Sequence, residues 1–216
     1  MFEIERLTAI KDNSPRRDRM KPMSLPAPTP DAPGAERTQL TVEQITHEAM
    51  ELVRRDGIDR LTIRALAARL GVAPAAVYYY VEGKEDLLQR IGGAIAQAVP
   101  NPPPGPWPER LRAHVKATVA TFSRFPGADA LAGSAEPWRR AAEERRPGAE
   151  LMAEAGVQAS QAAQVAFTVT LFLAGALRLA EVRRRAGETE PFADTPEMDL
   201  AVDTLIAGLR AQHGLA

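Results

Sequence analysis

The sequence predicts an all-α protein, with an N-terminal three-helix domain that contains a helix-turn-helix and a C-terminal helical domain. Apolar residues recur at the three- and four-residue spacing of amphipathic helices in several segments after residue 40. The segment from Leu61 to Lys84 has the pattern of two short helices joined by a tight turn. Six prolines between residues 100 and 108 then indicate a domain boundary. We expect domains at about 40–99 and 105–212, preceded by a disordered tail at 1–39.

The composition is that of a globular protein without cysteine chemistry. Of 216 residues, 45% are apolar and 25% are charged, the formal net charge is −1, and no cysteine is present. No stretch reaches the ~18 uninterrupted apolar residues of a membrane span, and the nearest, Val165 to Leu177, is interrupted by Thr168 and Thr170. The first residues lack the basic-then-apolar order of a signal peptide. We therefore expect a cytoplasmic protein that does not enter a membrane.

The first predicted helix runs from Thr41 to Gly57. Thr41 and Gln44 have the spacing of a capping box, in which each side chain bonds to the backbone N–H of the other residue. The apolar stripe of this helix is Val42, Ile45, Ala49, Leu52 and Val53. This helix should support the helix-turn-helix as the third member of a small bundle.

The helix-turn-helix is predicted from the residues at its start, at its turn and in its second helix. Thr62 is a good N-cap for the first helix. The apolar residues that follow at helical spacing are Ile63, Leu66, Ala67 and Leu70. Gly71 stands where helices end in a left-handed residue. Pro74 suits the first turn of the next helix, because its missing N–H would be unpaired there anyway.

Three consecutive tyrosines, Tyr78, Tyr79 and Tyr80, follow on the second helix. Successive helical residues are about 100° apart, so at least one ring must face outward. Either two rings pack inside and the third is incidental surface, or the hydroxyls donate to phosphates while the rings lie against sugars and bases. Charge favours the second interpretation, because four basic residues and one acidic residue at positions 60–84 give a local net charge of +3.

This segment resembles the DNA-binding signature of the tetracycline-repressor (TetR) family, through the pattern Thr-Ile-Arg-x-Leu-Ala-x-x-Leu-Gly-Val-x-x-x-x-Val-Tyr-x-Tyr-Val-x-x-Lys-x-x-Leu. The match covers roughly residues 41–95. The resemblance implies a dimeric bacterial transcriptional regulator, usually a repressor that a small ligand releases from DNA. The sequence departs from the family at Pro74, a position that is often polar, and Ala75 and Ala76 offer no hydrogen bonds to bases.

One set of residues is expected to contact double-stranded operator DNA. Arg64 is the candidate for a bidentate contact with guanine, and Tyr78 and Lys84 are candidates for phosphate contacts. The full set is Thr62, Arg64, Pro74, Ala75, Ala76, Tyr78, Tyr79, Tyr80 and Lys84.

In the N-terminal tail, six prolines and the lack of apolar periodicity predict disorder. Its basic run at 16–21 either is solvated or follows DNA into the minor groove.

The C-terminal half is predicted to hold the dimer interface. A helix from Lys84 towards Val99, with Gly92-Gly93 inside it, continues from the first domain, and others are expected over 107–122, 161–185 and after Thr195-Pro196. The helix at 161–185 is apolar nearly all round, so it must be covered on more than one side. Pairing of the last two helices with their symmetry mates would form a four-helix interface. The predicted interface residues are Val169, Phe172, Ala176, Leu179, Met198, Val202, Leu205 and Leu209.

The aromatic residues of the C-terminal domain suggest a pocket for a small-molecule effector, although filling the core would explain any single one of them. The predicted ligand-binding residues are Ile91, Ile95, Trp107, Leu111, Val115, Phe122, Trp138 and Phe172. The resemblance argues against tetracycline, because family members that bind it use a histidine near the end of the fourth helix. No histidine occurs here between Lys84 and Leu111.

No catalytic residue, metal site or cofactor is expected. The three histidines, His47, His114 and His213, lack metal-ligand spacing, and no phosphate-binding loop or nucleophile motif occurs. The sequence therefore predicts a ligand-released repressor that binds a near-palindromic operator as a homodimer. The alternative is a helical dimeric ligand-binding or scaffold protein without DNA binding.

Overall fold

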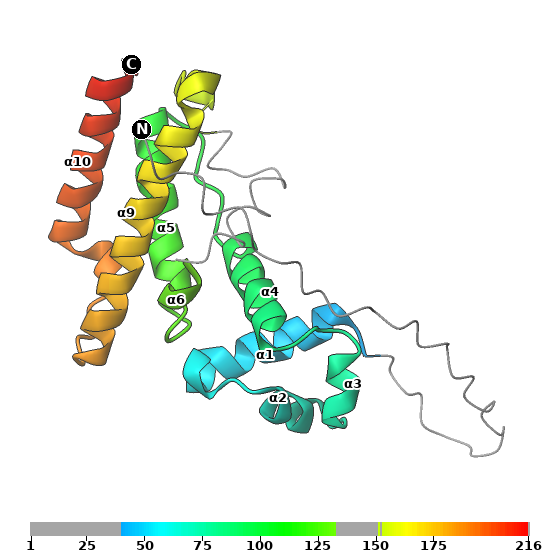
Figure 1. Cartoon of the computed structure of the whole chain (residues 1–216). Helices are drawn as coiled ribbons and strands as arrows, with labels where there is room; N and C mark the ends of the chain where they lie inside the picture. The colour runs from blue at the N-terminus through cyan, green and yellow to red at the C-terminus, as the bar shows by residue number, and fades with distance from the viewer. Residues whose placement is uncertain (1–39, 133–150, 152, 216) are drawn as a thin grey trace, which may run out of the picture. The chain divides into compact units, whose positions relative to one another are not determined.

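A computed structural model describes residues 40–132, 151 and 153–215 (Figure 1). These residues form helices and no strand, which confirms the predicted all-α class. They belong to one compact unit, Gln39–Ala216, so the predicted division at about residue 100 stays a prediction. The expected tail with its basic run, and Trp138, lie outside the described residues.

The N-terminal helices follow the predicted order. They are α1 (Val42–Asp56), the 3-10 turn η1 (Ile58–Arg60), α2 (Ile63–Leu70), α3 (Pro74–Tyr78) and α4 (Lys84–Gln97). The capping box at the start of α1 is confirmed: the Gln44 N–H donates to Thr41 Oγ1 at 3.2 Å, and the Thr41 N–H donates to Gln44 Oε1 at 3.0 Å. Gly57, with φ +83°, ends the helix. α1 contacts both α2 and α4, and its buried side faces them.

Long helices dominate the C-terminal part. They are α5 (Trp107–Phe122), the short α6 (Asp129–Ala132), α9 (Ala159–Arg185), the 3-10 turn η2 (Phe192–Asp194) and α10 (Pro196–His213). Figure 1 shows α5, α9 and α10 side by side, and each pair of these helices is in contact. Thr195 caps α10, because its Oγ1 accepts from the Met198 N–H at 3.3 Å. α4 contacts α5 and α6, which connects it with the C-terminal helices as predicted.

The helix α9 is less covered than the sequence predicts. Its 27 residues include an 18-residue window of mean hydropathy 1.7, of which 28% is buried. By length and composition α9 could cross a membrane, although no run of ~18 uninterrupted apolar residues occurs in it. An average over 18 residues tolerates Thr168 and Thr170, whereas a count of uninterrupted apolar residues does not. A single such helix is weak evidence, because core helices also meet this criterion.

A second connection, which the sequence does not predict, links the helix-turn-helix to the C-terminal helices. The Ile58 N–H donates to the carbonyl of Pro126 at 2.9 Å. Gly127 follows with φ +83°, and a Cβ on it would lie 2.6 Å from Cγ2 of Ile58. The turn at 126–127 therefore packs tightly against the residue that begins η1. Because η1 leads directly into Thr62, the N-cap of α2, this turn can affect the position of α2.

The carboxylate of Glu181, on α9, accepts a hydrogen bond from the backbone of this turn at Gly127. Glu181 is buried, and it accepts hydrogen bonds from Arg184 at 2.7 and 2.8 Å and from Arg185 at 2.7 Å. The hydrogen bond from Arg184 is the largest cause that lowers the pKa of Glu181 from 4.5 to about 2, and bonds from Arg185 and the Gly127 backbone act in the same direction. Burial opposes them. Glu181 thus ties α9 to the turn.

We expect the Glu181→Gln substitution to destabilise the protein near neutral pH, by on the order of 2 kcal/mol. A carboxyl whose pKa is lowered in the folded state contributes its full stabilisation of the fold above its unfolded pKa of 4.5. That contribution is lost as the pH falls towards the folded pKa of about 2. The difference from wild type in urea unfolding should therefore shrink over this pH range. Glu188→Gln is the control. Glu188 is an exposed ion-pair partner of Arg183, so this substitution should lower the free energy of unfolding by under about 1 kcal/mol. Equal losses in both variants would contradict the assignment.

Candidate nucleic-acid interface

The helix-turn-helix forms as its sequence predicts. Thr62 Oγ1 accepts from the Ala65 N–H at 3.0 Å and so caps α2. Gly71 ends α2 in the left-handed conformation, with φ 68° and ψ 27°. Pro74 occupies the first turn of α3. The inner faces of the two helices are closed by buried residues: Ile63, Leu66, Ala67 and Val77.

The tyrosines are arranged differently from the alternative in which two rings pack inside. The helix α3 ends at Tyr78, and Tyr79 is its C-cap. Tyr78 is 56% exposed and Tyr79 is 86% exposed. Only Tyr80 of the three is partly buried, and its ring meets the Tyr79 ring edge-on, with centroids 5.3 Å apart. Two phenol rings therefore face solvent next to the turn, where they could contact a ligand surface.

The cations of this region differ in how they are paired. Arg69 forms an ion pair with Glu48 of α1, which neutralises much of its charge. Arg64 and Lys84 are exposed, and neither has an ion-pair partner among the described residues. Lys84 begins α4, whose N-terminal N–H groups favour an anion. Arg64 and Lys84 therefore keep their charge available for phosphates or bases.

Small residues form the start of α3. Pro74 and Ala75 are exposed and Ala76 is half-buried, so the start of α3 presents backbone and short side chains to solvent. Such a surface allows close approach of a groove edge. The Thr62 hydroxyl already accepts the Ala65 N–H, which leaves its own proton free to donate. The nine predicted DNA-binding residues thus lie on α2, on α3 and the turn after it, or at their ends and the start of α4.

The predicted ligand-binding residues lie mostly in the hydrophobic core. Phe172 is partly buried, and Trp138 lies outside the described residues. The buried members are Ile91, Ile95, Trp107, Leu111, Val115 and Phe122. Their burial fits either a filled core or the wall of a pocket that opens for a ligand, so the assignment stays a prediction.

The predicted dimer residues of α10 face inward. Met198, Val202 and Leu209 are buried within the protomer, and their place in a dimer interface stays a prediction. Ala176 of α9 is buried as well, Val169, Phe172 and Leu205 are partly buried, and Leu179 is 47% exposed. The opposite face of α10 carries Leu200, which is 69% exposed. Sequence periodicity locates an apolar stripe but cannot distinguish the chain's own core from a partner.

The sequence predicts that α9 is covered on more than one side, but of the exposed apolar residues on its outward face it places only Leu179 in the interface. Phe167 is 68% exposed, Leu171 is 62% exposed, and Leu179 and Val182 are each 47% exposed. Residues 167, 171, 175, 179 and 182 follow the three- and four-residue spacing of one helical face. Exposed apolar rows of this kind mark interaction surfaces. The clue in the sequence was the lack of any polar stripe on this helix.

Comparison with known sequences gives a consistent result. Residues 45–91 match the family described as bacterial regulatory proteins, tetR family. The HTH-type transcriptional repressor Rv1353c of Mycobacterium tuberculosis is 26% identical over 185 residues, which cover 82% of this chain and 71% of that protein. The HTH-type transcriptional repressor DrrR1 of Streptomyces coeruleorubidus is 30% identical over 90 residues, which cover 40% of this chain and only 33% of that protein.

Solved structures share the fold. BioQ, solved with its double-stranded DNA operator, has a TM-score of 0.63 at 20% identity, covering 81% of this chain and 100% of that chain. ActR of Streptomyces coelicolor, solved with actinorhodin, has a TM-score of 0.66 at 19% identity, covering 82% and 98%. The sequence matches and the helix-turn-helix define the class, a DNA-binding transcriptional regulator. Residues 45–91 place the helix-turn-helix domain of this chain with the bacterial regulatory proteins of the tetR family.

Proposed function

We propose that this chain is a cytoplasmic, ligand-released repressor that binds a near-palindromic operator as a homodimer. The observation that carries the proposal is the surface of the helix-turn-helix, which exposes Tyr78 and Tyr79 together with Arg64 and Lys84, two cations without an ion-pair partner among the described residues. Aromatic rings and unpaired cations on a small-residue surface suit the sugar, phosphate and base edges of a major groove. A scaffold protein without DNA binding would have no need for them.

The first experiment is a binding titration of the protein against its own promoter region at several salt concentrations. The proposal predicts a footprint with two half-sites about one DNA turn apart, roughly 34–36 Å. Affinity should fall steeply with salt, because each neutralised phosphate releases counterions. Binding that does not depend on sequence would favour the alternative of a scaffold or ligand-binding protein.

We expect Arg64 and Lys84 to have separable roles. Lys84→Ala should weaken binding to all sequences about equally and reduce the salt slope by about one unit, because it removes a phosphate contact. Arg64→Ala should relax specificity at one position in each half-site, at a loss of roughly 1–3 kcal/mol, because it removes a base contact. Competition binding with a randomised operator library measures both.

Lys116→Ala is a matched control for these variants, because Lys116 pairs with Asp199 of α10 and lies on α5. It removes one positive charge and should leave both the salt slope and the sequence preference unchanged. An Arg64→Ala variant that loses affinity but retains the wild-type sequence preference would show that Arg64 contacts phosphate instead.

The proposed effector acts through α4. ActR, whose structure contains actinorhodin, shares this fold, which supports a small-molecule effector in the C-terminal domain of this chain. Ile91 and Ile95 of α4 are buried in the core, and α4 also contacts α1. A ligand that displaces α4 would therefore move the helix-turn-helix, and a coupling of ~1–3 kcal/mol would lower DNA affinity some 5–150-fold.

We expect Gly93→Ala to weaken induction without reducing operator affinity. A Cβ at Gly93 would meet nothing within 4 Å, so alanine should strengthen the helix by roughly 0.5–1 kcal/mol without a clash. Gly92 is buried and is left unchanged. Gly208→Ala, at a similarly open position in α10, is the control. The measurement is effector-dependent release of DNA, after an inducer has been found by screening; release at the wild-type inducer concentration would refute the role of α4 bending.

A further inference from the structure

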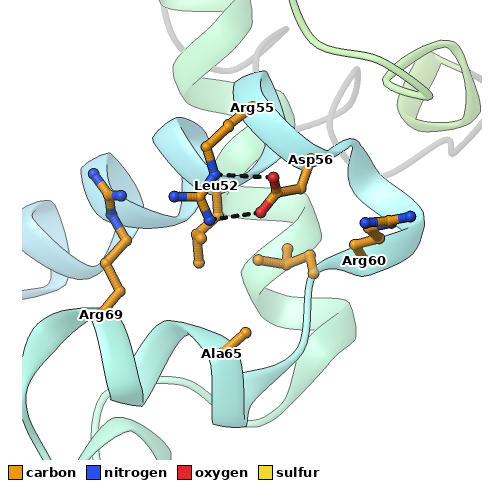
Figure 2. Close-up of a pocket in the computed structure, with 7 residues that line it drawn as sticks. Leu52, Arg55, Asp56, Arg60, Ala65 and Arg69 are labelled. Carbon is orange, nitrogen blue, oxygen red and sulfur yellow. Dashed lines mark hydrogen bonds and ion pairs between the residues drawn. The ribbon is translucent and has the colours of Figure 1, made fainter.

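The described structure has a basic pocket that the proposed function does not use. The pocket has a volume of about 340 Å³ and lies between the end of α1, η1 and α2 (Figure 2). Its lining residues are Leu52, Arg55, Asp56, Arg60, Leu61, Ala65 and Arg69. Three guanidinium groups therefore line a space that also has an apolar part. A volume of this size is at the lower end of the range for small-molecule sites.

The guanidinium groups differ in how much binding capacity they retain. Arg55 donates to both carboxylate oxygens of Asp56, at 2.9 and 2.7 Å. Arg69 is paired with Glu48. Arg60 has no ion-pair partner among the described residues, and Figure 2 shows Arg60 and Arg69 on either side of the pocket. An arriving anion therefore finds the donors of Arg60 unused, together with the spare N–H groups of the other two.

Asp56 occupies two donors of Arg55 and leaves those of Arg60 open. The hydrogen bonds from Arg55 are the main cause that holds the pKa of Asp56 below its usual range, and the charges of Arg60 and Arg69 act in the same direction. Asp56 thus stays ionised and bound to Arg55, which fixes the position of that side chain. Asp56 and Glu48 offset the charges of Arg55 and Arg69, so the net positive charge of the pocket comes from Arg60.

The apolar part of the pocket limits the kind of anion that fits. Leu52 and Leu61 are almost fully buried, at 6% and 1% exposed, so most of the apolar surface that a ligand can cover belongs to the half-buried Ala65. Ala65 lies on the α2 wall of the pocket, opposite Arg55 in Figure 2. Inorganic phosphate would leave this apolar surface uncovered, whereas an organic acid would cover it. The lining therefore matches a molecule with one charged end and one apolar end.

The pocket is also separate from the DNA-binding surface. Arg64 and Arg69 are five residues apart on α2, which places them roughly 140° apart around the helix. Ala65 and Arg69 are four residues apart and share the side of α2 that faces α1, as the Arg69–Glu48 pair shows. DNA that contacts Arg64 therefore meets a different side of α2 from the one that lines the pocket.

We propose that this pocket binds a small organic acid, with the carboxylate at the guanidinium groups and an apolar body against Leu52, Leu61 and Ala65. Guanidinium groups bind carboxylates through paired N–H donors, and a partly enclosed site strengthens that interaction. Such a ligand would bind the DNA-binding domain directly, unlike the effector proposed for the C-terminal helices.

The test uses the full chain without DNA, titrated with benzoate and followed by amide chemical shifts in NMR spectra. Benzamide, which has the same ring but no charge, and inorganic phosphate, which has charge but no ring, are the comparison probes. We expect benzoate to bind at least tenfold more tightly than either. Equal binding of phosphate and benzoate would overturn the proposal, because the apolar surface would then contribute nothing.

Two substitutions locate the site. Arg60→Gln should weaken benzoate binding at least tenfold, whereas Arg64→Gln, the same loss of charge on the other side of α2, should leave it unchanged. Ala65→Leu should weaken binding by filling the pocket without changing its charge. Equal weakening by Arg60→Gln and Arg64→Gln would overturn the proposal in favour of general attraction to a basic surface.

A DNA measurement separates this proposal from the proposed function. Operator affinity of Arg60→Gln should have the same salt slope as wild type. A slope reduced by about one unit would overturn the proposal and show that Arg60 contacts a DNA phosphate. Failure of the wild-type protein to bind any operator would refute the proposed function, while the benzoate titration without DNA would still stand on its own.

Discussion

Gly127→Ala should destabilise the protein by about 2–4 kcal/mol, one of the two largest effects that we expect from a single substitution. Two causes add. The backbone at Gly127 has φ +83°, a conformation that costs a residue with a Cβ roughly 1 kcal/mol or more. The new Cβ would also lie 2.6 Å from Cγ2 of Ile58, and that clash must be relieved by moving either the turn or η1. Urea unfolding followed by circular dichroism measures the loss.

Gly187→Ala separates the two causes. Gly187 has nearly the same backbone, with φ +85°, but its Cβ would meet nothing within 4 Å. Gly187→Ala should therefore lower the stability of the protein by only about 1 kcal/mol, the cost of backbone strain. In a double-mutant cycle, Ile58→Ala should partly relieve Gly127→Ala, so that the two losses together are smaller than their sum by about 1 kcal/mol or more. Strict additivity, or equal losses at Gly127 and Gly187, would show that the contact with Ile58 is not tight.

Leu171→Glu should produce monomers at concentrations where the wild type is dimeric. In the proposed homodimer, the outward face of α9 with Phe167, Leu171 and Val182 is covered by the same face of the partner. A two-fold interface contains each substitution twice, so two carboxylates would be buried without partners. A loss of roughly 3 kcal/mol or more, or over about 100-fold in the dimer dissociation constant, is expected.

Analytical ultracentrifugation across micromolar concentrations measures this effect, and operator binding should fall with it. Gln158→Glu is the control, because it adds the same charge at the exposed N-cap of α9, on the side away from the outward face. That variant should remain dimeric. A wild-type protein that sediments as a monomer would refute the interface, and a dimeric Leu171→Glu would place the interface on other helices.

Local signals in the sequence were reliable where each element is determined by its own residues. The capping box at Thr41, the N-cap at Thr62 and the left-handed Gly71 involve bonds or backbone angles within about four residues. Their outcome does not depend on the rest of the fold, so they could be predicted. The start of α10 at Thr195-Pro196 belongs to the same group.

The features that the sequence did not predict depend on distant residues. Ile58 and Pro126 are 68 positions apart in the sequence but are joined by a backbone hydrogen bond. No local pattern indicates that the Ile58 N–H will donate to that particular carbonyl. The inward direction of Met198 and Val202 is set by the packing of α10 against α5, η2 and α9 rather than by the stripe itself. The exposure of Tyr79, the C-cap of α3, depends on what packs around a helix of only five residues.

The outward face of α9 makes the output of the proposed repressor depend on its abundance. Two protomers must associate before two helix-turn-helix units can occupy one operator. Below the dimer dissociation constant, the concentration of dimers rises with the square of the protomer concentration. When a cell contains half as much protein, operator occupancy then falls about fourfold instead of twofold. A helix left bare in the protomer thus gives the promoter a steeper response to dilution during growth than a monomeric repressor could.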